Sequence, residues 1–531
     1  MLDIERIDLC TAKQVIRLLE LENQRLLTRL EQQTRELAGL KNLDSTTQLE
    51  LELGRLQEQL ARMRHQLFGA RSEKRPHSGP HGDADDASGS TTKPAPKRRG
   101  HGPTRQPMLP VVERPPIELA PDERACNVCR GQLDEWKGQF ETSEVITVVE
   151  RKYIIEKVMR QKYRCRCQAK VRCAPAPLAL IPGGRYSLEF AVTVALDKYL
   201  DCLALHRQAS RMGREGLWIT SQTLFDQLLA LARLLENVYD VLGEQILTQS
   251  VVHIDETTWR FLNGKPSKKW FLWCITNDRG AYFRLVPSRA STVALELLEG
   301  YCGTVVSDGY KVYTSLAKKP STQFRFAFCW SHVRRKLICA EPAYPQCTKA
   351  LELIRKLYAI ERRLPKRHDN GDTDVRDAVR ARRARLRRKL SRPITRKLRK
   401  WALAQRGLPE SSLRKATDYM LELWPGLTAF LDDPDIPLDN NAVERQLRGP
   451  VVGRKVHLGS RSENGTKVAE VFYTLIHSAV IAGVEPRRYL LEAARRALEQ
   501  PGAVLLPHEL HEPQEHESDE QNAWALTQKP S

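Results

Sequence analysis

The chain has 531 residues, of which 41% are hydrophobic and 28% charged, and it carries a formal net charge of +20. This length is too great for one compact domain and predicts three or four, with enough apolar material for packed cores. The basic charge favours a polyanion as partner, so nucleic acid is the first functional expectation.

The sequence predicts a cytoplasmic protein without membrane contact. Met1–Glu5 lacks the basic start of a signal peptide, and the leucine-rich stretch that follows is interrupted by charges. The longest apolar run, Val471–Gly483, is too short to cross a bilayer. In the cytoplasm the 12 cysteines are reduced thiols or metal ligands rather than disulfides.

A heptad pattern predicts a coiled coil over residues 14–68. The steps of four and three are clearest at Leu49, Leu53, Leu56, Leu60, Met63 and Leu67. Such a seam of apolar residues joins two helices. Asn23 occupies an a position, where a polar residue commonly fixes a parallel dimer. We expect a homo-oligomer, and a helical hairpin within one chain is the alternative.

A linker and a small zinc module follow. Residues 71–118 are predicted to be a disordered basic linker, because Pro, Gly, Ser, Asp and Lys dominate there. The zinc module is predicted over residues 119–178, with two pairs of ligands: Cys126 and Cys129, then Cys165 and Cys167. Four thiolates close a structural Zn²⁺ site. The second pair is tighter than a zinc knuckle, so Cys173 can replace one of its members, and idle thiols are the alternative to zinc.

Residues 185–240 are predicted to form a helix-turn-helix that binds DNA. Helices are expected at Leu188–Leu200, Leu205–Arg214 and Thr220–Leu234. Gly216 marks the turn before the last helix, and Thr220 or Ser221 can cap it. Two short helices joined by a turn that contains glycine fit this motif, although the same pattern occurs in ordinary helical packing.

The next region has the pattern of a mixed sheet that presents two carboxylates. Strands are expected at Val251–Asp255, Lys269–Thr276, Ala281–Pro287, Gly303–Ser307 and Gln323–Cys329, with a helix at Thr292–Leu298. Asp255 ends the first strand, and Asp308 follows the fourth. If those two strands are neighbours, the two side chains meet. This is the strand order of a ribonuclease-H-like core.

A third carboxylate follows a basic helical insertion, predicted over residues 336–435. From Arg376 to Lys400 nearly every other residue is Arg or Lys, which fits either a solvated face or one that tracks DNA phosphates. Asp439 or Asn440 can then cap a new helix, and Glu444 lies within its first two turns. Four basic residues that can hold DNA phosphates follow: Arg445, Arg448, Arg454 and Lys455.

The sequence thus predicts a multidomain α/β plus α protein. Its ribonuclease-H-like catalytic core comprises residues 248–335 and 436–500, and residues 505–531 form a flexible tail. Asp255, Asp308 and Glu444 are predicted to hold two Mg²⁺ or Mn²⁺ ions, which prefer oxygen ligands. Two such ions about 3.5–4 Å apart activate a water and stabilise the leaving oxygen in phosphodiester cleavage. Each carboxylate alone is also typical of an ordinary turn, so the prediction depends on all three.

These blocks resemble transposases of the insertion sequence family 66, in the DDE class. The most specific match is Asp439–Arg445, and further matches are His253–Thr257, Asp308–Tyr310 and Cys329–Lys336. The resemblance implies a bacterial transposase, associated with the nucleoid when bound to DNA, with Asp255, Asp308 and Glu444 as its triad. It implies cleavage at the ends of a mobile element and transfer of the freed 3′-hydroxyl to target DNA. Accessory proteins of the same element are implied as partners.

Two other functions share parts of this pattern. A non-catalytic protein that binds element ends would keep the coiled coil, the zinc module and the helix-turn-helix. A structure-specific nuclease on the same fold would cleave DNA without joining it to a target. The sequence favours the transposase because all three carboxylates are present.

Overall fold

The computed structural model describes residues 54–61, 152–164, 171–262, 268–319, 322–365, 373–405 and 407–510, together with Arg25, Thr28 and Met63. The chain divides into two units, one of Met1–Ala70 with Tyr153–Ser531 and one of Arg71–Lys152. All elements below belong to the first unit. The predicted linker and the zinc ligands Cys126, Cys129, Cys165 and Cys167 lie outside the described residues.

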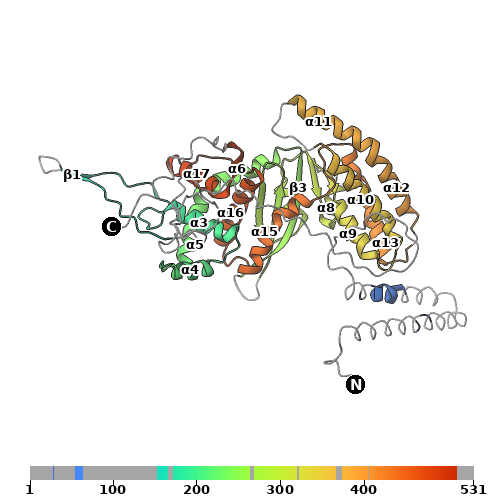
Figure 1. The fold of residues 1–531 in the computed structure, drawn as a ribbon, viewed down its shortest axis with the longest axis horizontal. Helices are drawn as coiled ribbons and strands as arrows, with labels where there is room; N and C mark the ends of the chain where they lie inside the picture. Colours follow the sequence, from blue (N-terminus) through green and yellow to red (C-terminus); the bar gives the residue numbers. More distant parts are fainter. Residues whose placement is uncertain are drawn as a thin grey trace, which may run out of the picture. The chain divides into compact units, whose positions relative to one another are not determined.

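A five-stranded mixed sheet forms the centre of the first unit (Figure 1). Its order is β5-β4-β3-β6-β7, with β3 (Val251–Phe261), β4 (Lys268–Thr276), β5 (Ala281–Val286), β6 (Thr304–Ser307) and β7 (Arg325–Phe328). β3 pairs antiparallel with β4 and in parallel with β6. The predicted neighbourhood of the first and fourth strands is therefore confirmed.

β3 is longer than the sequence predicted. It does not end at Asp255 but continues to Phe261, because its pairing with β4 extends that far. Trp259 and Phe261 are buried and alternate with exposed polar residues, which is the pattern of a strand with one covered face. Asp255 consequently lies inside a strand, with backbone hydrogen bonds on both sides of it.

The helices begin and end close to the predicted positions. Before the sheet lie α3 (Leu188–Tyr199), α4 (Leu205–Arg214), α5 (Ser221–Leu234) and α6 (Glu236–Leu247). Among the strands lie α7 (Ser291–Leu297) and α8 (Lys311–Ala317). Thr220 caps α5 as predicted, because its Oγ1 accepts from the backbone N–H of Thr223 (3.1 Å).

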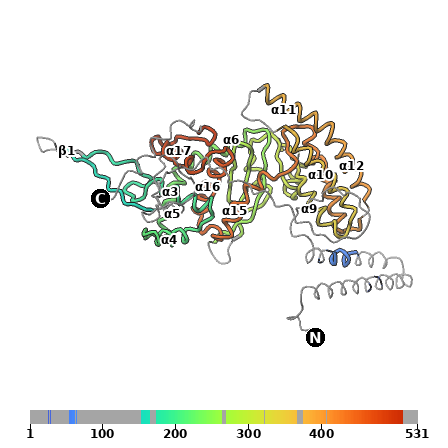
Figure 2. The backbone as a smooth tube through the Cα atoms, in the orientation of Figure 1, coloured from blue at the N-terminus to red at the C-terminus, as the bar shows by residue number. Residues whose placement is uncertain are grey.

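After β7 the chain leaves the sheet, forms the insertion and returns, as the change from yellow to red traces in Figure 2. The helices on this path are α9 (Trp330–Ala340), α10 (Cys347–Arg363), α11 (Thr373–Leu386), the π-helical turn η3 (Arg387–Ser391), α12 (Arg392–Leu403), α13 (Ser412–Glu422) and α14 (Trp424–Thr428). The returning helices are α15 (Asn441–His457), α16 (Glu463–Ile481) and α17 (Pro486–Glu499). In the sequence, the insertion thus lies between the strands of the sheet and α15, which carries Glu444.

The two faces of the sheet bury different helices. Ile254 and Trp273 belong to a core shared with α9, α10, α12 and α13, whereas Leu272 and Cys274 belong to a core shared with α3, α5, α16 and α17. Successive strand residues point to opposite faces, so Asp255 lies on the second face, beside its partner Cys274. α15 also packs on β3 and β4 and adds Val443 and Leu447 to that second core.

The packed chain extends to residue 510. Leu505 and Leu506 are buried beside α17, and the Tyr489 hydroxyl donates to the carbonyl of Leu505 (2.9 Å). The predicted flexible tail therefore does not begin at residue 505, because these two leucines close the core.

The described residues of the predicted coiled coil, which are 54–61 with Arg25, Thr28 and Met63, are helical. Glu58 of this helix accepts a hydrogen bond from the backbone N–H of Ser412, at the start of α13. The described residues do not include a second helix paired with this one in a coiled coil, so self-association remains a prediction.

Among the described helices, none is by itself long and apolar enough to cross a membrane. α16 and α17 meet the length and composition of a span only as a pair, with a bend of 120° between them.

Candidate active site

Asp255 and Asp308 lie where the two central parallel strands separate. The parallel pairing of β3 with β6 runs from Val251 to His253, whose partner is Val306. Carried two residues further, this register sets Asp255 opposite Asp308, the first residue after β6. The two carboxylates predicted from the sequence therefore lie side by side at the end of the β3–β6 pairing.

Asp255 is half-buried and lies close to other acidic groups. Burial, together with the negative charges of Asp308, Glu256 and Glu444, raises its pKa to about 8. The backbone N–H of Glu256 donates to Asp255 Oδ1 (2.8 Å) and opposes that rise. Glu444 is thus within electrostatic reach of Asp255, although it lies far later in the sequence.

The loop that carries Asp308 is fixed by the insertion. Asp308 Oδ1 accepts from the backbone N–H of Tyr310 (3.0 Å), which forms a tight local turn. The backbone N–H of Gly309 donates to the hydroxyl of Tyr419 on α13 (3.0 Å). A Cβ atom at Gly309 would lie 2.5 Å from that hydroxyl oxygen, so only glycine allows this approach. The insertion therefore helps to shape the candidate site.

Glu444 lies in the first turn of α15 and faces His332 on α9. Glu444 Oε1 and His332 Nε2 are 3.8 Å apart, which is too far for a direct hydrogen bond. Glu444 Oε1 and His332 Nδ1 are both buried, and neither has a hydrogen-bond partner within the described part of the chain. A buried carboxylate oxygen without a donor is costly, so a ligand position is the natural explanation for it.

Asn440 joins the elements that carry the site. Its side chain is fully buried, and its Nδ2 donates to the backbone carbonyl of Ile254 (2.9 Å). Its Oδ1 accepts from His253 Nδ1 (2.9 Å), and its backbone N–H donates to Cys329 Sγ (3.2 Å). Asn440 precedes α15 as predicted, but its side chain does not cap that helix. It instead ties α15 to β3 and to the start of α9.

Glu256, the neighbour of Asp255, has a different role. It lies on the opposite face of β3, where its Oε1 accepts from Arg289 Nε (2.5 Å) and its Oε2 accepts from the Tyr313 hydroxyl. Arg289 also stacks on the ring of Tyr310, 3.8 Å from the centroid. With both oxygens engaged, Glu256 is structural, whereas Asp255 remains available.

The four predicted phosphate-binding residues fall into two groups. Arg445, Arg448 and Lys455 are exposed along one face of α15. Arg454 is partly buried, and its Nη1 donates to the hydroxyls of Thr257 (3.2 Å) and Thr258 (3.1 Å) on β3. Burial and the charge of Arg260 lower the pKa of Arg454. Arg454 therefore fastens α15 to the sheet.

Metal sites are not preformed in the part of the chain that the structure describes. No group of three or more His, Cys, Asp or Glu side chains there is close enough to hold an ion. Asp255, Asp308 and Glu444 interact through charge, but their oxygens are not gathered into one coordination shell. Cys173, the alternative zinc ligand, ends β2 (Val171–Cys173), where it pairs with Lys162 at the start of β1 (Lys162–Arg164). Its side chain is exposed.

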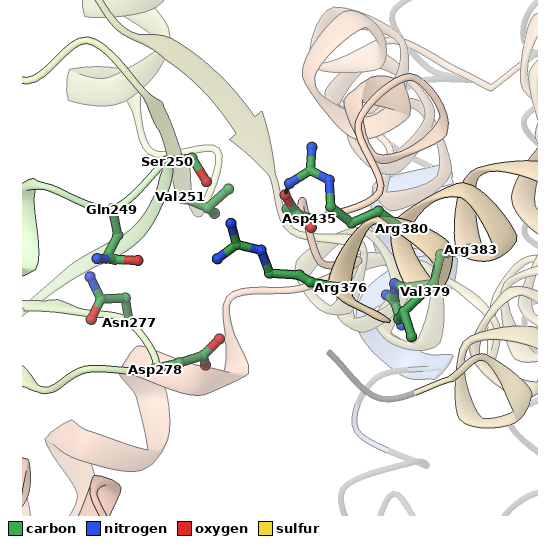
Figure 3. A pocket seen from close by; sticks show the side chains of 10 residues that line it. All are labelled: Gln249, Ser250, Val251, Asn277, Asp278, Arg376, Val379, Arg380, Arg383 and Asp435. Atoms are coloured by element: carbon green, nitrogen blue, oxygen red, sulfur yellow. Dashed lines mark hydrogen bonds and ion pairs between the residues drawn. The ribbon is translucent and has the colours of Figure 1, made fainter. Parts of the chain in front are cut away.

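A separate cavity of about 200 Å³ lies at the start of β3, between the sheet and α11. Figure 3 shows Arg376 of α11 extending toward Gln249 and Val251, with Arg380 beside Asp435 and Arg383 farther from the strand, next to Val379. Arg380 is paired with Asp435, and Arg383 Nη1 donates to the carbonyl of Pro365 (2.7 Å). Two of the three arginines that line the cavity therefore make contacts within the insertion. The cavity lies at the end of β3 that precedes Asp255, away from the carboxylates.

Comparison with known families gives one match to a family profile. The family described as "Transposase IS66 family" matches residues 183–468, which include Asp255, Asp308, Glu444 and the whole insertion. The match covers more than half of the 531 residues.

Curated relatives come from Sinorhizobium fredii (strain NBRC 101917 / NGR234) and are themselves uncharacterized. The protein y4jD is 30% identical over 400 residues, which cover 72% of this chain and 76% of the relative. The protein y4hP is 26% identical over 427 residues, which cover 75% of each chain. The printed names of these relatives assign no activity.

Proposed function

The chain belongs to the IS66 family of transposases, and from this premise we propose that it cleaves the ends of an insertion element and joins the freed 3′-hydroxyl to target DNA. The observation that carries the proposal is the strand register that sets Asp255 opposite Asp308, with Glu444 close enough for its charge to help raise the pKa of Asp255. The sheet order β5-β4-β3-β6-β7 supports a ribonuclease-H-like catalytic core.

We assign metal binding to the three carboxylates. Two Mg²⁺ or Mn²⁺ ions held there would supply an activated water and neutralise the charge on the leaving oxygen. The residues fit such ions for two reasons. Their donors are carboxylate oxygens, which hard cations prefer, and Glu444 Oε1 lacks a hydrogen-bond donor in the described structure. A cation would also offset the like charges that raise the pKa of Asp255.

The chain's own residues position these groups and the DNA. Asn440 and Arg454 hold α15 on β3, so Glu444 keeps its place relative to Asp255. Tyr419 holds the loop of Asp308. Arg445, Arg448 and Lys455 are exposed on α15, where they bind the DNA phosphates next to the scissile bond.

Other parts of the chain supply recognition and assembly in this proposal. α4 and α5 form the helix-turn-helix that binds element ends, and Trp218 in their connection is 88% exposed. Cys126, Cys129, Cys165 and Cys167 hold a structural Zn²⁺. Residues 14–68 join copies of the chain, and accessory proteins of the element act as further partners.

Replacing Asp308 by asparagine tests the proposal. The Asp308→Asn side chain keeps the oxygen that accepts from Tyr310 N–H and removes the negative charge, so the local turn survives. We expect end cleavage and strand transfer with Mg²⁺ or Mn²⁺ to fall by more than about a hundredfold, which is the upper limit for losing a mere hydrogen-bond partner of a metal ligand. The matched control is Asp418→Asn, an exposed aspartate paired with Arg414 within α13.

Three outcomes distinguish the candidate functions. Loss of cleavage in Asp308→Asn but not in Asp418→Asn supports the transposase. Cleavage by the natural chain without joining identifies a nuclease. Binding of element ends without any nick, in Mg²⁺ or Mn²⁺, identifies a non-catalytic DNA-binding protein. Unchanged cleavage in Asp308→Asn removes this residue from the site.

A further inference from the structure

The helix formed by α11, η3 and α12 has two faces of different character. Between residues 378 and 409 the chain has thirteen Lys or Arg and no Asp or Glu. This excess of one sign is unusual for a surface whose charges serve only solubility, where both signs are mixed. Nine of these cations separate into an inner set of three and an outer set of six.

The inner set is neutralised by the fold. Arg387 is fully buried and donates to both carboxylate oxygens of Glu361 (2.8 Å each) and to the carbonyl of Phe430 (2.8 Å). Arg383 also reaches Glu361, and Arg392 pairs with Asp432. The inner cations therefore hold residues 430–435, the segment that leads to Asn440 and Glu444.

The outer set is not neutralised. We define the outer basic face as Arg382, Arg385, Lys389, Arg396, Lys397 and Lys400, all of which are exposed. None of the six has an ion-pair partner among the residues that the structure describes. Arg382, Arg385 and Lys389 follow one another by three and four residues, and Arg396 lies seven residues further on, with Lys397 and Lys400 beside it. Figure 1 shows α12 on the side of the insertion away from the strands, whereas the start of α11 lies close to the sheet, where it lines the cavity at Ser250 and Val251.

The length and chemistry of this face fit duplex DNA. Residues 382 to 400 span about 27 Å at about 1.5 Å per residue, which equals roughly eight base pairs. The only aromatic residue of α11, η3 and α12 is Trp401, and it is buried. The face therefore offers no ring on which single-stranded bases stack, and only charges that meet phosphates.

We propose that the outer basic face is a sequence-independent clamp for the phosphate backbone of duplex DNA. The role of this clamp rests on the proposed transposase function. The binding of DNA to the outer basic face does not itself require cleavage. DNA held on the outer face is linked to the third carboxylate through the inner arginines and residues 430–440. The clamp thus fixes the duplex relative to Glu444, while sequence recognition belongs to other parts of the chain.

Neutralising four outer cations tests the clamp in the full-length chain. The variant combines Arg382→Gln, Arg385→Gln, Lys397→Gln and Lys400→Gln. The matched control removes the same charge from exposed cations that already have carboxylate partners: Lys318→Gln, Arg414→Gln, Lys415→Gln and Arg495→Gln. Binding of a 20-base-pair duplex of arbitrary sequence is followed by fluorescence anisotropy over a KCl series, with EDTA present.

Each phosphate contact contributes about 0.9 to the slope of log K against log[KCl]. We expect the slope of the outer variant to become shallower by about 3 to 4, with affinity at low salt at least about tenfold weaker. The control should change the slope by less than about one. A slope shift no larger than that of the control overturns the proposal. The proposal is also overturned if the outer variant loses binding to single-stranded RNA but binds duplex DNA as well as the natural chain does.

A second measurement does not depend on any variant. Duplex DNA should protect Lys389, Lys397 and Lys400 of the natural chain from acetylation, and leave Lys415 reactive. Equal reactivity with and without DNA rejects the clamp. The same assays in Asp308→Asn separate the two proposals, because a defective triad abolishes cleavage and leaves the salt slope unchanged.

Discussion

At the scale of single residues, the site depends on a side chain that performs no chemistry. Asn440 is buried and satisfies the Ile254 carbonyl and His253 Nδ1 at once. Removing it deprives both of these buried groups on β3 of a hydrogen bond, and such a loss costs about 1–3 kcal/mol for a group that is left unsatisfied. Both groups directly precede Asp255 in the strand, so we expect the loss to act on the carboxylates first. We regard Asn440 as a positioning residue for Asp255 and Glu444.

We predict that Asn440→Ala weakens Mn²⁺ binding by about tenfold to a hundredfold, the range for outer hydrogen-bond partners of a metal site. Isothermal titration calorimetry with Mn²⁺ measures this without any turnover. In DNA cleavage the same change should lower kcat and leave KM for DNA nearly unchanged, since Asn440 does not face the DNA.

Gln446→Ala is the control for Asn440→Ala. Gln446 lies on the same helix and accepts from His477 Nδ1 (2.8 Å), on the side of α15 that packs against α16. Its loss destabilises α15 without reaching the carboxylates. If both variants weaken Mn²⁺ binding equally, Asn440 acts through stability alone.

At the scale of elements, α16 seals the edge of the sheet with a ladder of side chains. Glu470, Thr474 and Ser478 accept hydrogen bonds from the backbone N–H groups of Leu285 (2.6 Å), Phe283 (3.0 Å) and Ala281 (3.0 Å). Four residues of helix advance about 6 Å, close to the advance of two residues of strand, so the two repeats match. The exposed donors of edge strand β5 are thereby covered, which prevents pairing with another chain.

The ladder predicts a pH dependence of stability. Burial raises the pKa of Glu470 from 4.5 to about 7, although the Leu285 N–H, Arg284 and Lys467 oppose the rise. The folded state therefore binds this proton more tightly than the unfolded state. The stability from the protonated form is complete below pH 4.5 and is lost as the pH rises through 7. The loss amounts to at most about 3 kcal/mol at about 1.36 kcal/mol per pKa unit.

Glu470→Gln should remove this loss, because the amide keeps an oxygen acceptor and carries no charge. We expect its melting temperature, relative to that of the natural chain, to increase from pH 5 to pH 8. Glu463→Gln, at the exposed start of α16, should show an offset that does not change with pH. A pH-independent difference for Glu470→Gln would show that Glu470 is not the group that titrates.

Local pattern was enough to predict most elements and two parts of the site. The apolar strands that carry Asp255 and lead to Asp308, and the cap at Thr220, follow from alternation and turn chemistry over a few residues, although the end of the first strand was predicted too early. The role of Asn440 could not be predicted, because its partners His253 and Ile254 are distant in sequence and any capping residue fits its position. The same limit applies to Arg387, whose burial depends on Glu361 and the backbone of residues 430–433.

At the scale of the whole molecule, two residues of the predicted heptad seam are exposed in the part of the chain that the structure describes. Leu56 and Met63 occupy seam positions seven residues apart and are 52% and 55% exposed, while Glu58 between them is buried against Ser412. Among the described residues this helix therefore packs through the side of Glu58, and Leu56 and Met63 are open to a partner. A second copy of the chain is the partner that the heptad predicts. An insertion element has two DNA ends, so a dimer would offer one candidate active site to each end.

We predict that Leu56→Lys combined with Met63→Lys converts the protein to a monomer of 60.7 kDa, measured by light scattering. Burying each of these side chains in a dimer contributes roughly 1.5–3 kcal/mol, and lysine at both positions replaces that gain with repulsion between like charges. The control places lysines at two exposed apolar residues outside the heptad, Val375→Lys and Leu403→Lys, and should keep the larger mass. A natural chain that already has a mass of 60.7 kDa at micromolar concentration contradicts the prediction. If both double variants remain dimeric, the chain associates through a surface other than the seam.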